Sequence, residues 1–243
     1  MNYHYVWLIW SSAFLVPWVI LFALNPVYRP VMWRTSCWTA LLGITEPIFV
    51  PEYWDPPSLF ELARRTGFDV ESFIFSFAIG GIGVLLYHTF TRKDFAVVEP
   101  IERWQPLHRF HLHALLAPFA LFVPLYFAPW NPIYPSITCL VIGAIVAVYC
   151  RPDLRYKTLI GGMLFLGLYA IYMLGLKWFA PGYIEQVWNL PELSGVLIYG
   201  IPLEELLFGF SFGLYWTGVY EHFAWKRSVD RDNAPPLLTG DAS

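Results

Sequence analysis

Seven runs of apolar residues, each long enough to cross a bilayer as a helix, constrain this chain most. A hydrocarbon core of about 30 Å takes about 20 helical residues. Apolar side chains make up 57% of the 243 residues and charged ones only 14%, against about 25% charged in soluble domains. The sequence therefore predicts an all-α, polytopic bundle of seven transmembrane helices. We place them near Val6–Leu24, Trp33–Val50, Asp69–Tyr87, His111–Ala128, Pro132–Cys150, Thr158–Ala180 and Val196–His222.

The lysines and arginines support this count and orient the chain. Basic residues are retained on the cytoplasmic side of short loops. The connections after helices one, three and five, together with the C-terminal tail, hold twelve of the fifteen, and the opposite face holds Arg64, Arg65 and Lys177. We therefore expect a multi-pass protein of the cell (inner) membrane, with its N-terminus outside and its C-terminus in the cytoplasm.

The second half of the chain repeats the first in order. The matched segments are Val27–Pro30 with Val148–Pro152, Phe49–Tyr53 with Phe179–Tyr183, Trp54–Leu59 with Trp188–Leu193, and Val70–Phe77 with Leu203–Phe210. Helices one to three then correspond to helices five to seven, which predicts a three-plus-one-plus-three parallel internal duplication. The expected units are a first repeat (1–90), a linker with helix four (91–131), a second repeat (132–224) and a disordered cytoplasmic tail (225–243).

Glu204 and Glu205 follow an apolar stretch that begins at Val196, so they are expected on the order of 12 Å inside the last helix. A charge in the bilayer interior costs at least about 2.5–3.5 kcal/mol, so such residues usually face the bundle interior and carry function. A structural alternative is a helix that begins at Pro202, where proline and anions are favoured at the N-terminus. Glu71 precedes its apolar run and is the weaker candidate.

Aromatic residues reach 19% of the chain, more than belts at the membrane interfaces need. Several follow the glutamates along their helices, where ring faces could stabilise a cation, although core packing explains each ring equally well. The predicted substrate-binding residues are Pro202, Asp69, Phe75, Phe77, Phe208, Phe210, Phe212 and Trp216.

Other polar residues favour structural interpretations. His108, His111 and His113 are expected to have an interfacial role rather than to bind metal, and no metal is predicted. Cys37, Cys139 and Cys150 have no metal-like spacing and are expected to be buried small residues. The sequence has no nucleotide-binding fingerprint, and we expect no cofactor and no nucleic-acid partner.

The segment Pro202-Leu203-Glu204-Glu205, at the head of an aromatic-rich helix, resembles the Pro-x-Glu-Glu signature of membrane-embedded lycopene cyclases. That family includes the bacterial heterodimeric type, its fused form, and the cyclase half of a fungal bifunctional protein. Phe49–Trp54 and Phe68–Ser72 are also similar to it. The first copy departs from the pattern, with Asp69 in place of proline and Ser72 in place of the second glutamate.

The resemblance implies cyclisation of the acyclic ends of lycopene to β-ionone rings, giving γ-carotene and then β-carotene, without a required flavin. It also implies lycopene and other carotenoids as partners, besides membrane lipids. Our hypothesis is that a protonated Glu204 or Glu205 donates to the terminal alkene, the carbocation closes the ring, and Glu71 removes a ring proton. The sequence leaves the oligomeric state open.

Two other functions fit parts of the pattern. Seven helices with buried carboxylates would suit a proton-coupled transporter or a light-driven pump. A retinal pump needs a lysine within the last helix, and none precedes Lys226. A carotenoid hydratase would begin with the same protonation and then capture water.

Overall fold

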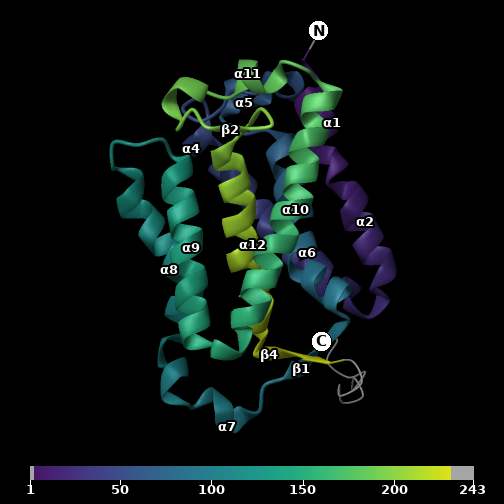
Figure 1. Ribbon diagram of the computed structural model, residues 1–243, viewed down its shortest axis with the longest axis vertical. Helices are drawn as coiled ribbons and strands as arrows, with labels where there is room; N and C mark the ends of the chain where they lie inside the picture. The colour runs from purple at the N-terminus through teal and green to yellow at the C-terminus, as the bar shows by residue number, and fades with distance from the viewer. Residues whose placement is uncertain (1–2, 231–243) are drawn as a thin grey trace.

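The computed structural model describes residues 3–230, which form a bundle of long helices (Figure 1). Within that range, five helices are long and apolar enough to cross a membrane, which confirms the predicted membrane-helix character. They span Val6–Leu24, Val70–Thr91, Pro106–Tyr126, Ile133–Cys150 and Pro152–Phe179. The predicted count of seven is not confirmed, because the second and last predicted helices depart from it in the ways described next.

Proline interrupts the first two predicted helices. A proline inside a helix lacks an N–H, and its ring clashes with the carbonyl four residues earlier. Pro17 accordingly follows a break at Phe14, and Pro47 follows a 3-10 turn that contains Gly43. The elements in this region are α1 (Val6–Ala13), α2 (Leu15–Leu24), η1 (Pro26–Tyr28), α3 (Arg29–Ala40), η2 (Leu41–Thr45) and α4 (Glu46–Phe49).

The last helix begins seven residues later than the sequence predicted. The apolar stretch from Val196 starts as a hairpin of β2 (Leu197–Ile198) and β3 (Ile201–Pro202), and α12 spans Leu203–Ala224. Tyr199 and Gly200 join the strands with φ angles of 52° and 80°, and two positive φ angles are what a two-residue type I′ turn requires. Glu204 and Glu205 therefore lie in the first turn of α12, and the predicted depth inside a helix is wrong.

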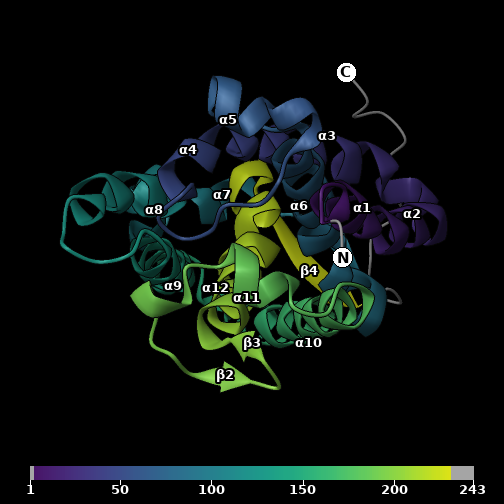
Figure 2. The same cartoon turned by 90° about the horizontal axis from the view of Figure 1, so that it is seen from above.

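Helices α6 (Val70–Thr91) and α12 lie at the centre of the bundle, as Figure 2 shows for α12. α12 packs against α9 (Ile133–Cys150), α10 (Arg155–Phe179) and α6, while α6 also packs against α3. The approach of α3 and α6 depends on glycine, because a Cβ at Gly80 would overlap the side chain of Thr39. This agrees with the close helix packing that small residues permit in membranes.

A two-stranded sheet closes one end of the bundle. β1 (Lys93–Val97) follows α6, β4 (Lys226–Asp230) follows α12, and the two pair antiparallel with Lys93 opposite Asp230. The prediction of disorder is therefore wrong for the first residues of the tail, because backbone pairing with β1 orders them; residues 231–243 lie outside the described residues. Every boundary of α12 and β4 falls 133 residues after the matching boundary of α6 and β1. The internal duplication itself stays a prediction.

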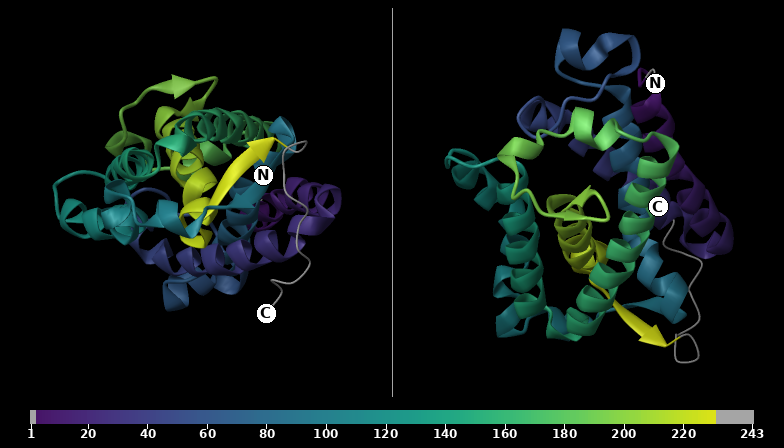
Figure 3. Two further views of the ribbon diagram at one scale, coloured as in Figure 1. Left: turned by 90° about the horizontal axis from the view of Figure 1, so that it is seen from below. Right: turned by 45° about the horizontal axis from the view of Figure 1, so that its top comes forward.

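The remaining elements connect the long helices at the two ends of the bundle. α5 and α11 lie at the end opposite the sheet of β1 and β4 (Figure 1). Figure 3 shows the bundle from the end with this sheet on the left, and with the end of α5 and α11 tilted toward the viewer on the right. These connecting elements are η3 (Leu59–Glu61), α5 (Leu62–Thr66), α7 (Pro100–Arg103), η4 (Pro106–Phe110), η5 (Pro152–Leu154), α11 (Tyr183–Val187) and η6 (Leu190–Glu192). The remaining long helix, α8 (His111–Tyr126), packs against α9.

A buried ionic cluster joins α6, α10 and α12 near the sheet. His88, Lys157 and Glu221 are each at most 2% exposed. The Lys157 Nζ lies 2.8 Å from His88 Nε2, which is 3.0 Å from Glu221 Oε1, and Lys157 also pairs directly with Glu221. A buried charge is tolerated when it is paired in this way. The cluster therefore ties together three helices that are distant in sequence.

Candidate active site

A cavity of about 310 Å³ lies inside the bundle. Residues of α4, α6, α8, α9, α10 and α12 line it, and about half of the lining side chains are aromatic. Two carboxylates line it, Glu46 and Glu205. Its volume falls in the range of small-molecule sites, about 300–1,000 Å³, and an apolar wall with few polar groups is typical of them.

Glu205 is held by three donors at the head of α12. The Tyr53 hydroxyl and the Trp188 indole N–H donate to Oε1, the latter at 2.7 Å, and the Tyr169 hydroxyl donates to Oε2 at 2.5 Å. The side chain is 4% exposed. Burial, followed by the nearby Glu205 carboxylate, raises the pKa of the Tyr53 hydroxyl well above its usual range, so Tyr53 keeps its proton. The three donors fix the carboxyl group of Glu205 at the cavity wall.

Two loops from the two halves of the chain meet beside Glu205. The Asn189 N–H donates to the Tyr53 carbonyl at 2.9 Å, and the Asp55 N–H donates to the Val187 carbonyl at 2.9 Å. Between these contacts, the rings of Trp54 and Trp188 lie 5.3 Å apart. Backbone pairing at this point explains how Tyr53 reaches a carboxylate that is 152 residues away in sequence.

Glu204 points away from the cavity, although it is the neighbour of Glu205. Successive residues on a helix are rotated by about 100°. Its Oε1 accepts hydrogen bonds from the Tyr134 hydroxyl at 2.8 Å and from the Ser194 N–H at 2.8 Å, and the residue is 1% exposed. These contacts tie α9 and the loop before β2 to α12. Glu204 and Glu205 are therefore both buried, as expected, but only Glu205 faces the cavity, whereas Glu204 binds the loop before β2.

Glu71 and Asp69 are also buried without lining the cavity. Glu71 Oε1 accepts from the Leu59 N–H at 2.7 Å, in the segment that precedes α5. Asp69 is the N-cap of α6 and accepts a hydrogen bond from the Ser72 N–H at 2.5 Å. An N-cap side chain usually binds one of the backbone N–H groups that have no partner at the start of a helix. The structure thus does not bring Glu71 into the cavity that Glu205 faces.

Glu46 was not singled out from the sequence. It begins α4, is 6% exposed, and accepts from the Ser72 hydroxyl at 2.8 Å through Oε2. The sequence did contain an indication, because Glu46 lies inside the predicted span Trp33–Val50. The argument that an ionisable residue within a membrane helix usually carries function applies to Glu46 as it does to Glu204. Ser72, where the first copy lacks a second glutamate, is the residue that binds this carboxylate.

The predicted substrate-binding residues divide into two groups. Phe75, Phe208, Phe212 and Trp216 line the cavity, while Asp69, Phe77, Phe210 and Pro202 do not. Phe77 packs against the tryptophans Trp18 and Trp33 instead. The sequence did not identify Tyr215 of α12, which also lines the cavity, or the rings that come from other segments. These other rings are Trp7, Phe49, Tyr53, Trp54, Phe119, Phe122, Tyr169, Tyr172 and Trp188.

Comparison with known families adds an independent observation. The family model described as Lycopene cyclase matches residues 131–223. The match confirms, for this part of the chain, the resemblance to lycopene cyclases that Pro202–Glu205 indicated. The matched segment contains α9, α10 and α12, and with them Tyr169, Trp188 and Glu205. No curated protein and no solved structure matches the chain.

The match to the lycopene cyclase family model supports an enzyme that acts on a carotenoid, and the apolar helices support association with a membrane. The cavity has the features that such a substrate needs. Its wall is largely apolar and aromatic, and its carboxylates are the groups that can exchange protons with an alkene. The part of the cavity formed by Glu46 and Tyr53 lies outside the matched segment.

Proposed function

We propose that the protein is a lycopene β-cyclase, an intramolecular lyase or isomerase that converts the acyclic ends of lycopene to β-ionone rings, giving γ-carotene and β-carotene. The observation that carries the proposal is the buried carboxyl of Glu205 at the wall of an aromatic cavity, within a segment of the lycopene cyclase family. Substrate and product are isomers. The reaction therefore needs a proton donor and a proton acceptor, with no net transfer of electrons.

Glu205 is the proposed acid. Trp188 can only donate, so Oε1 of Glu205 must act as an acceptor there. A tyrosine hydroxyl can both donate and accept, so Tyr169 can turn to accept when Oε2 carries a proton. In the reaction, that proton adds to the terminal double bond and leaves a tertiary cation. The electron pair of the next double bond then closes the six-membered ring and moves the cation onto the ring.

Glu46 is the proposed base, in place of Glu71. The ring cation becomes a β-ring when a ring C–H bond gives its electron pair to form the new double bond and its proton leaves. Glu46 faces the cavity and Glu71 does not. The Ser72 hydroxyl donates to Oε2 of Glu46 and fixes this carboxyl group at the cavity wall. Glu204 and Glu71 then have structural roles at the outer loops.

The aromatic wall protects the cation. Ring faces attract a positive charge within about 6 Å of their centroids, and Phe208, Phe212 and Trp216 line the cavity along α12 beyond Glu205. Excluding water prevents capture of the cation as an alcohol, which is the outcome that would make the protein a hydratase. A cavity of about 310 Å³ accommodates one end of a long polyene, so the rest of the carotenoid extends between helices.

The test of function uses bacteria that accumulate red lycopene. Expression of the wild-type protein is expected to give yellow cyclic carotenes, identified by chromatography and mass. Glu205→Gln is expected to leave lycopene unchanged at equal protein in the membrane fraction. Glu185→Gln, which changes an exposed glutamate of α11, is the matched control and is expected to behave as wild type. Unchanged lycopene with the wild-type protein, or hydroxylated products, would contradict the proposal.

We also propose that α3 to α4 and α12 cross the membrane, which gives seven spans, an external N-terminus and a cytoplasmic C-terminus in the cell membrane. The alternation of basic residues supports this orientation. Single cysteines at Glu185 and at Trp104 test it in a background without native cysteines. A membrane-impermeant thiol reagent is expected to label Glu185→Cys in intact cells and to label Trp104→Cys only after lysis. The reverse pattern would overturn the orientation.

A further inference from the structure

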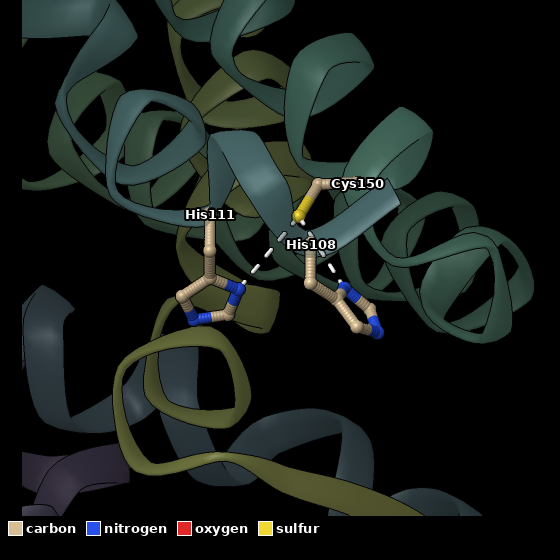
Figure 4. Close-up of side chains that lie close together, drawn as sticks. All are labelled: His108, His111 and Cys150. Carbon is tan, nitrogen blue, oxygen red and sulfur yellow. Dashed lines mark hydrogen bonds between the residues drawn. The ribbon is translucent and has the colours of Figure 1, made fainter. Parts of the chain in front are cut away.

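Two histidines and a cysteine converge outside the cavity, near the end of the bundle that carries the sheet of β1 and β4. His108 lies in η4, His111 begins α8, and Cys150 ends α9. None of them lines the cavity. Figure 4 shows both imidazole rings turned with a nitrogen toward the thiol. α8 and α9 pack against each other, and the connection of six residues between them lies at the opposite end of both helices from these three side chains.

The spacing of the three atoms suits a tetrahedral ion. His108 Nδ1 and His111 Nδ1 each lie 3.7 Å from Cys150 Sγ, and all three potential ligand atoms lie within 4.8 Å of one another. A tetrahedral zinc ion, with Zn–S of about 2.3 Å and Zn–N of about 2.0–2.1 Å, sets sulfur and nitrogen about 3.6 Å apart. The two sulfur distances are therefore already close to those of an occupied site.

The hydrogen bonds of His111 leave its inner nitrogen free to bind an ion. His111 Nε2 lies 2.6 Å from the His222 carbonyl, which can only accept, so Nε2 carries the proton and Nδ1 presents a lone pair. A ligating histidine usually donates its other N–H to a carbonyl or carboxylate in this way. His108 Nδ1, at the same distance from the thiol, presents a second lone pair when the proton of that ring lies on Nε2.

The surroundings hold the ligands in place and balance the nearest charge. His111 is stacked between Trp225, at 3.8 Å and 8°, and His222, at 4.6 Å and 22°. Arg151 follows Cys150 and is buried, but two hydrogen bonds of 2.8 and 2.7 Å pair it with Asp153. The neighbouring guanidinium charge is thereby compensated, so it does not prevent a cation from binding.

We infer that His108, His111 and Cys150 bind a zinc ion that clips η4 and α8 to the end of α9. Thiolate and imidazole ligands select zinc over magnesium and calcium, which prefer oxygen. The fourth position is open to water, because His108 and His111 are only half-buried. The site is independent of the proposed cyclase chemistry, and it predicts metal dependence of stability rather than of the proton transfer.

The experiment uses the full-length protein purified in detergent, stripped with a chelator and then incubated with Zn²⁺. One zinc per chain is expected by elemental analysis, and Zn²⁺ is expected to raise the melting temperature of the wild-type protein. Co²⁺ in its place is expected to give the visible bands of a tetrahedral ion and a sulfur-to-cobalt charge-transfer band. Absence of stoichiometric zinc and of the charge-transfer band in the wild-type protein would overturn the proposal without any variant.

Variants then assign the ligands. Cys150→Ser is expected to abolish the charge-transfer band. His111→Gln is expected to weaken zinc binding at least about 100-fold, because loss of a residue that only hydrogen-bonds to a metal ligand already costs about 10–100-fold in affinity. Cys139→Ser, on the same helix, and His113→Gln, two residues after His111, are the matched controls and should bind zinc as wild type does. Equal zinc binding by Cys150→Ser would show that the metal sits elsewhere and would refute the assignment.

Discussion

The hydroxyl of Tyr53, from the loop after α4, donates a hydrogen bond to Glu205 in the first turn of α12. This contact joins the two halves of the chain at the wall of the cavity. It also shows why the last helix alone does not make the site, since one of the three donors to Glu205 comes from a segment outside the part that matches the lycopene cyclase family.

Tyr53→Phe is expected to lower the rate of cyclisation about 10-fold or more. It removes one hydrogen bond to a carboxyl group, and bonds to charged groups contribute about 1.5–3 kcal/mol. The initial rate of cyclic carotene formation by protein reconstituted in lipid is the measurement. Tyr183→Phe is the matched control, because the Tyr183 hydroxyl is buried without a partner among the described residues. A rate equal to wild type for Tyr53→Phe would remove the hydroxyl from the mechanism.

Four of the buried glutamates, Glu46, Glu71, Glu204 and Glu205, are expected to separate into two classes. Glu46→Gln, like Glu205→Gln, should lower turnover at least about 100-fold, the range that proton transfer by a positioned side chain contributes. Glu71→Gln should keep most activity, because Glu71 does not line the cavity. Product analysis of the variants at equal membrane content is the measurement. An active Glu46→Gln beside an inactive Glu71→Gln would restore Glu71 as the base.

Glu204 is expected to act on stability rather than on chemistry. Glu204→Leu removes the acceptor for Tyr134 and for the Ser194 N–H, and a buried donor left without a partner costs about 1–3 kcal/mol. Glu204→Gln keeps one oxygen acceptor and should cost less. Thermal unfolding in detergent, together with activity per folded protein, separates the two effects. Severe loss of turnover in a Glu204→Gln protein of normal stability would make Glu204 the acid.

The buried cluster of Lys157, His88 and Glu221 gives a prediction about stability. Lys157→Met leaves the Glu221 carboxylate buried without its cation, and breaking a buried pair costs about 3–5 kcal/mol. The double variant Lys157→Met with Glu221→Leu should recover much of that loss in the free energy of unfolding. Losses that simply add in the double variant would show that the pair is not coupled.

Hydropathy predicted the long helices well, because burial in lipid imposes a length of about 20 apolar residues whatever their order. It failed at the start of α12, where the hairpin of β2 and β3 is as apolar as a helix. Gly200 and Pro202 indicate a turn at this point, but an average of hydropathy does not take account of turn-forming residues. The break between α3 and α4 was likewise readable from Pro47.

The candidate site was predictable only in part, because it is assembled by contacts between distant segments. Glu205 and four of the aromatic residues were found from their positions along α6 and α12. Tyr53 and Trp188 come from the loops after α4 and α11, and nothing in their own sequence context points toward a carboxylate. Which face of α12 meets the cavity also depends on packing, so the sequence could not distinguish Glu204 from Glu205.

Proton addition from a carboxyl group, without redox chemistry, is the central claim, and cyclisation in D₂O tests it most directly. Reconstituted protein, equilibrated in D₂O and given lycopene with no added nucleotide or flavin, is expected to form cyclic carotene that carries one deuterium for each ring. Mass spectrometry of the product measures the label. Cyclic product without deuterium, or product that forms only when an electron donor is added, would contradict the account.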